Sequence, residues 1–179
     1  MEKGKQNLGI TYGAISGLVS VVLTLVFYLG GVKWFTNPIA YAAFAIPIIF
    51  AVVAGLKQKK MNGGYLEFKE ALKVVFTTFV IAALIGTVFN YVLFNIIDVP
   101  FREALTQEIA MTSQKFMQRF NVPQEEIDKQ VEKILKGNSF SLGTMLLNFA
   151  YGCIFWFIVS LIIAAIIKKK RPEFPEATV

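Results

Sequence analysis

The stretch VVFTTFVIAALIGTVFNYVLFNII, residues 74–97, contains 24 residues and no Asp, Glu, Lys or Arg. A hydrocarbon core of roughly 30 Å is crossed by about 20 apolar residues in an α-helix. Because lipid offers no partners for backbone polar groups, a run of this length folds as a helix that bonds its own backbone. The stretch therefore predicts a transmembrane helix.

Uncharged runs of similar length recur in three other places, and 55% of the chain is hydrophobic. Apolar residues bunched in this way are typical of membrane proteins. The first run follows Lys3 and Lys5 as in a signal peptide, but it is longer than a signal-peptide core and no Ala-x-Ala-like site follows it. We therefore predict an all-α, polytopic membrane protein, a single domain over residues 1–179, with transmembrane helices at about 8–32, 36–56, 74–97 and 142–167.

Charged residues outside these spans are distributed unequally between the two sides of the membrane. If four helices thread the bilayer, eleven Lys and Arg and five Glu lie on the side of both chain ends and the loop 57–73. The other side carries seven basic and seven acidic residues. Because cytoplasmic loops carry the excess of Lys and Arg, we expect both termini in the cytoplasm. The net charge of +6 then reports orientation and not nucleic-acid binding.

The connection between the third and fourth spans is the longest on the extracytoplasmic side. Within about 100–136, apolar residues recur at helical spacing, are interrupted at Pro123 and resume until Gly137. Proline suits a first helical turn, and Lys133 and Lys136 suit a helix end. We predict an extracytoplasmic helical hairpin whose apolar stripes are covered by each other, by the bilayer surface or by a partner. On the cytoplasmic side, the loop 57–73 ends in an interfacial helix start.

Small residues in the spans indicate where helices approach closely. Gly9, Gly13 and Gly17 lie four residues apart, and in lipid such packing drives helix association. Their neighbour is either another span of the same chain or a second copy in a homo-oligomer. Gly86 and Gly152 each lie one turn from an Asn, and we expect them to permit close approach as well.

The polar residues Asn90 and Asn148 lie at matching depths in the third and fourth spans. At about 1.5 Å per residue, both are roughly 10 Å from the extracytoplasmic ends of their helices, so we expect them to meet. One interpretation is an interhelical hydrogen bond, worth roughly 0.6–2 kcal/mol. The other is a small cavity in which these residues, with Tyr91, Asn95 and Tyr151, bind a polar headgroup.

Catalytic motifs are missing from the sequence. It contains no His and a single Cys, Cys153, which excludes an intramolecular disulfide and a His-ligated metal. It has no phosphate-binding glycine loop, no Gly-x-Ser-x-Gly elbow and no metal-ligand spacing. No ionisable acid or base interrupts a span, which argues against a proton-coupled pump. We expect no catalytic residues, no metal and no cofactor.

The segment GGYLEFKEALKVVFTTFVIAALIGTVFNYVLFNIID, residues 63–98, is followed by NVPQEEID and by a last apolar span that ends in lysines. This pattern resembles a family of small four-helix bacterial membrane proteins catalogued only as a domain of unknown function. The resemblance implies the four-helix fold and the bacterial inner (cytoplasmic) membrane, and it brings no catalytic residues.

The lack of reactive groups and the ordered hairpin together suggest a function. We expect a non-enzymatic inner-membrane protein, an accessory or scaffold subunit that docks an envelope partner through the hairpin. The alternative is a small transport or lipid-translocation subunit for a neutral or lipid-linked solute. The expected partners are the lipid bilayer and either an envelope protein or a second copy of the chain, without nucleic acid.

Overall fold

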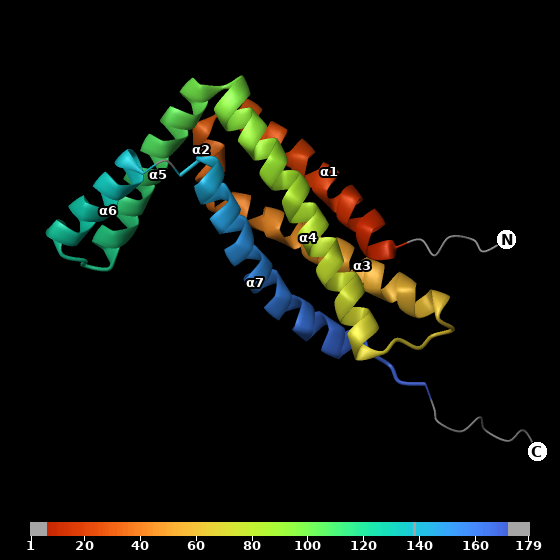
Figure 1. Ribbon diagram of the computed structural model, residues 1–179. Helices are drawn as coiled ribbons and strands as arrows, with labels where there is room; N and C mark the ends of the chain where they lie inside the picture. The colour runs from red at the N-terminus through yellow and green to blue at the C-terminus, as the bar shows by residue number, and fades with distance from the viewer. Residues whose placement is uncertain (1–6, 138, 172–179) are drawn as a thin grey trace, which may run out of the picture.

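The structure is a computed structural model that describes residues 7–137 and 139–171. Apart from one isolated β-bridge, these residues form helices and turns, which confirms the all-α prediction. In chain order the elements are α1 (Leu8–Gly30), α2 (Val32–Phe35), the 3₁₀ helix η1 (Pro38–Phe44), α3 (Ala45–Met61), α4 (Phe68–Val92), the π-helix η2 (Leu93–Ile97), α5 (Val99–Arg119), α6 (Gln124–Lys136) and α7 (Leu142–Ile167) (Figure 1).

Four helical segments are long and apolar enough to cross a membrane, which confirms the prediction of a membrane protein with four spans. They are Leu8–Gly30, Pro38–Met61, Phe68–Ile97 and Leu142–Ile167. The second span extends to Met61, beyond the predicted end at residue 56, because long Lys side chains reach water from the last turn of a membrane helix. The chain ends 1–6 and 172–179, for which we predict a cytoplasmic location, lie outside the described residues.

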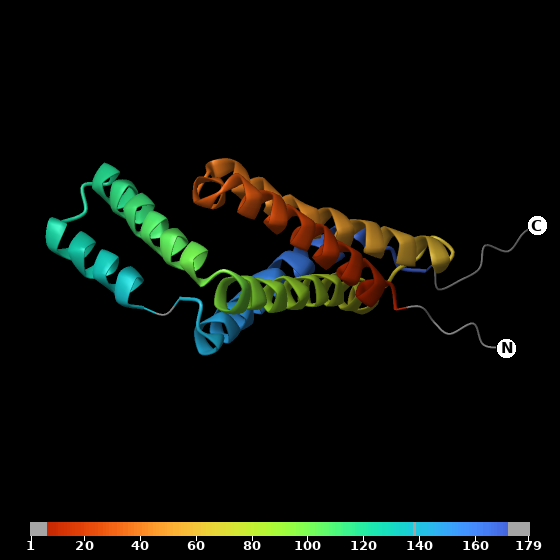
Figure 2. The same ribbon diagram turned by 90° about the horizontal axis from the view of Figure 1, so that it is seen from above.

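Helix α4 lies at the centre of the bundle and contacts α1, α3 and α7 (Figures 1 and 2). The start of α1 and the end of α7 lie at one end of the bundle, here named the terminal end. Helices α5 and α6 lie at the opposite end, here named the α5 end. Large apolar side chains, such as Leu29 at 82% exposure and Ile166 at 75%, cover the outside of the bundle, as lipid contact requires.

The three glycines of α1 form a seam against α4, and this contact lies within the chain. Gly9, Gly13 and Gly17 are buried, and a Cβ at Gly13 would lie 2.7 Å from Ile81 Cβ and 2.9 Å from the Thr78 carbonyl oxygen. The two backbones are therefore too close for any side chain at these positions. We call these three residues the glycine seam.

The terminal end is fastened by hydrogen bonds between segments far apart in the chain. Leu66 and Lys169 exchange two backbone hydrogen bonds of 2.8 Å each, and the Lys59 ammonium donates to the Ile167 carbonyl oxygen at 2.8 Å. The Glu70 carboxylate accepts hydrogen bonds from two amides at the end of α3. These bonds join the loop after α3 to the start of α4 and to the end of α7.

Asp98 fixes the start of α5 to the bundle. Its Oδ1 accepts a hydrogen bond from the Phe101 backbone N–H at 2.9 Å, and its Oδ2 accepts one from the Tyr28 hydroxyl at 2.7 Å. The Phe101 hydrogen bond, with the Tyr28 bond second, holds the pKa of the Asp98 carboxyl below its usual value, so the carboxylate is ionised at neutral pH. Phe94 and Leu105 are buried in an apolar cluster at the same junction.

Helices α5 and α6 contact each other and form a pair that projects from the α5 end, at an angle to the four long helices (Figures 1 and 2). Between them, Asn121 adopts a left-handed backbone with φ of 53°, a conformation that Asn tolerates in turns. Ile127 of α6 is only 1% exposed, whereas the rest of α6 is largely polar and exposed. The extracytoplasmic location of this α5–α6 pair stays a prediction.

Candidate functional site

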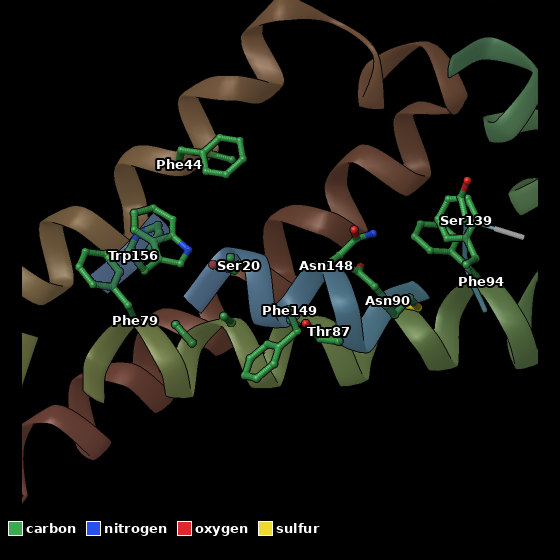
Figure 3. Close-up of a pocket in the computed structure, with 18 residues that line it drawn as sticks. Ser20, Phe44, Phe79, Thr87, Asn90, Phe94, Ser139, Asn148, Phe149 and Trp156 are labelled. Atoms are coloured by element: carbon green, nitrogen blue, oxygen red, sulfur yellow. The ribbon is translucent and has the colours of Figure 1, made fainter. Parts of the chain in front are cut away.

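A cavity of about 440 Å³ lies between η1, α3, α4 and α7, towards the α5 end of the bundle (Figure 3). Its walls are mostly apolar. Phe79 and Trp156 close one end, with ring centroids 4.4 Å apart and planes 13° from parallel. Phe94 and Phe140 stand at the other end, with centroids 5.1 Å apart. The cavity therefore extends along the helices, between two aromatic pairs.

Gly86 of α4 and Gly152 of α7 line this cavity and do not pack closely. A Cβ at either position would meet nothing within 4 Å. The helix-packing role that we expected for them is therefore wrong. Because glycine has no side chain, Gly86 and Gly152 instead leave open the space between α4 and α7 at this level.

Asn90 and Asn148 both line the cavity, and Figure 3 shows their amides reaching into the same space from α4 and α7. The structure shows no hydrogen bond between them, so the interhelical bond we considered is not formed. Asn90 Oδ1 is buried and has no hydrogen-bond partner among the described residues. A buried carbonyl oxygen without a hydrogen-bond partner lowers the stability of the fold by roughly 1–3 kcal/mol, so a partner is expected for it.

The other three members of the expected polar cluster lie outside the cavity lining. Asn95 joins two elements, since its Nδ2 donates to the Phe140 carbonyl oxygen at 2.9 Å and its Oδ1 accepts from the Arg102 guanidinium at 3.0 Å. Tyr91 lies beside Asn95, since the Asn95 Nδ2 also donates to the Tyr91 carbonyl oxygen at 3.1 Å. Tyr151 is 68% exposed on the outside of α7.

Sequence reasoning missed several residues of the cavity. Thr87 lies one turn before Asn90, and helical periodicity is the signal that could have placed it there. Ser20 comes from α1, and no signal in the sequence reveals which helix faces which across a bundle. Trp156 is a further lining residue, and with Phe79 it closes one end of the cavity, here named the floor.

The described residues that line the cavity include no Asp, Glu, Lys, Arg, Cys or Tyr. Its polar side-chain groups are the hydroxyls of Ser and Thr, the amides of Asn and the indole N–H of Trp156, and none of them carries a charge. Within residues 7–137 and 139–171, no three His, Cys, Asp or Glu side chains gather where they would hold a metal ion. The arrangement is suited to binding an uncharged or amphiphilic group.

The chain was compared with known proteins. The model of a family described as "Protein of unknown function (DUF4199)" matches residues 11–169. The chain belongs to this family. The DUF4199 match includes all residues that line the cavity, as well as α5 and α6. It confirms the resemblance to a family of unknown function, whose description names no activity. No curated protein and no solved structure matches the chain significantly.

Proposed function

We propose that the protein is a non-enzymatic membrane subunit that holds a lipid or a lipid-linked solute in the cavity between α3, α4 and α7. The observation that carries this proposal is Asn90 Oδ1, a buried acceptor without a partner among the described residues, in a mostly apolar cavity. A ligand that donates a hydrogen bond here offsets the desolvation of this oxygen and leaves its apolar part among the aromatic rings. The volume falls within the range of roughly 300–1,000 Å³ that is usual for ligand sites.

The membrane and the orientation are part of the same proposal. The resemblance to small bacterial membrane proteins suggests a bacterial inner membrane, and the excess of Lys and Arg at the terminal end supports an orientation with both chain ends in the cytoplasm. In this orientation the cavity begins at the outer side of the bilayer and reaches past its middle. A lipid would then enter it from the outer leaflet, without its apolar chain crossing water.

A photoreactive lipid tests the proposal. We expect a diacylglycerol with a diazirine in one acyl chain to label α4 and α7 of the purified full-length protein in nanodiscs. Replacing Asn90 and Asn148 together by Leu should lower this labelling at least about fivefold, because the loss of one or two hydrogen bonds in an apolar site costs roughly 1 kcal/mol or more. The measurement is the labelled fraction by mass spectrometry, with the peptides mapped.

Asn7→Leu is the matched control, since Asn7 is exposed at the start of α1 and its side chain caps nothing. Its labelling should equal that of the wild type. The circular dichroism and gel-filtration profiles of each variant report whether it folds. Equal labelling of the folded double variant and the wild type would contradict a role for the cavity.

A second candidate function is the docking of an envelope protein on α6. The supporting observation is the polar face of α6, where two ion pairs, Lys129 with Glu125 and Lys136 with Glu132, lie exposed at the surface. Exposed pairs of this kind contribute little to stability, so changing Glu125, Asp128, Lys129 and Glu132 to Ser should leave the fold intact. We expect this variant to lose a specific partner that crosslinks to wild-type Lys133 from the outside. An unchanged crosslink pattern would rule out this face.

A further inference from the structure

A second hollow adjoins the cavity at the α5 end. It has a volume of about 420 Å³ and lies between the start of α5, the end of α6 and the segment that leads into α7. Ser139 and Phe140 line both hollows. The two spaces therefore adjoin at these two residues. The cavity lies within the membrane spans, and the second hollow lies beyond their end.

The second hollow differs from the cavity in its chemistry. Arg102, Lys136 and Glu103 line it, with Thr106 and Gln107 beside them, so its charged groups sum to one positive charge. Lys136 is exposed and paired with Glu132 in α6. Among the described residues the ion pairs are the two within α6, so Arg102 has no carboxylate partner there. Arg102 is therefore the cation of this hollow that no carboxylate among the described residues pairs.

The Arg102 guanidinium is held in position from one side. One of its terminal nitrogens donates to Asn95 Oδ1 at 3.0 Å, and the Asn95 amide in turn donates to the Phe140 carbonyl oxygen at 2.9 Å. Arginine carries five N–H donors in a planar fork, and the hydrogen bonds found among the described residues use one of its nitrogens. A half-buried guanidinium that is positioned in this way binds the oxygens of a phosphate with little loss of side-chain freedom.

We propose that the two hollows form one site for a lipid that carries a phosphate, with the phosphate on Arg102 and an acyl chain in the cavity. This inference rests on the proposed function and names its ligand class. From Phe94 in η2 to Phe79 in α4, the helix rises roughly 22 Å at about 1.5 Å per residue, which exceeds half of a bilayer core of roughly 30 Å. The cavity is thus long enough for one acyl chain of a leaflet. Asn90 lies between the phosphate position and the Phe79–Trp156 pair, where its Nδ2–H groups can donate to the ester oxygens of the lipid.

The test compares two lipids with identical acyl chains, phosphatidic acid and diacylglycerol, that differ only in the phosphate. Binding to the purified full-length protein in an uncharged detergent is measured by native mass spectrometry. We expect phosphatidic acid to bind at least about tenfold more tightly than diacylglycerol, because hydrogen bonds to a charged group are stronger than neutral ones. Arg102→Gln should remove this preference and leave diacylglycerol binding unchanged.

Arg119→Gln is the matched control, because Arg119 is exposed in the last turn of α5 and lines neither hollow. We expect it to keep the full preference for phosphatidic acid. Arg102→Lys serves if Arg102→Gln does not fold, and it should keep part of the preference, since Lys retains the charge without the fork. Inorganic phosphate and glycerol phosphate are measured in parallel, and we expect neither to bind at concentrations where phosphatidic acid does.

The outcomes separate the two proposals. If both lipids bind equally and Arg102→Gln has no effect, the phosphate site is wrong while the cavity still holds a lipid. If inorganic phosphate binds as tightly as phosphatidic acid, and does so through Arg102, the ligand is a free phosphate and the lipid is wrong. If Arg119→Gln weakens phosphatidic acid as much as Arg102→Gln, general surface charge explains the preference and the site is wrong. If the wild type retains neither lipid, the proposed function fails as well.

Discussion

Gly13→Leu is expected to lower the free energy of unfolding by at least about 1–3 kcal/mol, the usual cost of overpacking a well-packed site. The added Cβ would lie 2.7 Å from Ile81 Cβ and 2.9 Å from the Thr78 carbonyl oxygen. The carbonyl belongs to the backbone of α4 and cannot rotate away, so α1 has to move from α4 along the whole glycine seam. Unfolding in sodium dodecyl sulfate, followed by circular dichroism, measures the change.

Gly86→Leu makes the same substitution where the chain leaves room. A Cβ at Gly86 meets nothing within 4 Å, and Leu favours a helix over Gly by up to about 1 kcal/mol. We expect this variant to unfold like the wild type or at slightly higher detergent concentration. If Gly13→Leu and Gly86→Leu lower the free energy of unfolding equally, the close packing of α1 against α4 does not explain the loss at residue 13.

Phe79→Ala is expected to cost about 2–3 kcal/mol, somewhat less than the roughly 3–5 kcal/mol typical of this change in soluble cores. Phe79 is 1% exposed and stacks on Trp156, so its removal leaves an empty volume on the floor of the cavity. The cost is lower because helices that separate in lipid return a Phe side chain to hydrocarbon and not to water. Unfolding in detergent gives the free energy, and the emission of Trp156, measured with Trp34 replaced by Phe in both proteins, reports the lost contact.

Phe155→Ala is the comparison for this change, because Phe155 lies in the same helix as Trp156 and is 56% exposed. When an exposed Phe side chain on the outside of the bundle is removed, lipid fills its place and no cavity forms. We expect a loss below about 1 kcal/mol. If Phe155→Ala lowers the free energy of unfolding as much as Phe79→Ala, the burial of Phe79 between α4 and α7 does not explain the cost of its removal.

The four spans could be predicted because their signal is local. A run without charges and of membrane length has one physical outcome in lipid, wherever its neighbours lie. Helix α6 could be predicted equally well, because both of its ends are marked in the sequence. Pro123 and acidic residues mark its start, and lysines mark its last turn. The spacing of Gly9, Gly13 and Gly17 predicted a close contact, but it left open whether the partner was α4 or a second copy.

The cavity could be predicted only in part, because it depends on how helices stand relative to one another. Counting residues from the helix ends placed Asn90 and Asn148 at the same depth, and the structure brings both into one cavity. Depth says nothing about separation, so a hydrogen bond and an open space were equally consistent with the sequence. The same ambiguity explains the error at Gly86 and Gly152, since a glycine accommodates a close neighbour and an empty space alike.

The π-helix η2 has a consequence for how chains of this kind change by insertion and deletion. In it the Asp98 backbone N–H bonds to the Leu93 carbonyl oxygen at 2.9 Å, five residues back, where an α-helix reaches back four. Loss of one residue within 93–97 would return this turn to the α-helical pattern, and the Asp98 N–H would again lie over the Leu93 carbonyl oxygen. The segment that follows would therefore keep nearly the same direction. Loss of one residue from the uninterrupted part of α4 would instead turn that segment by about 100° around the helix axis. The wide turn is thus a place where the chain can shorten by one residue while the α5–α6 pair keeps its neighbours.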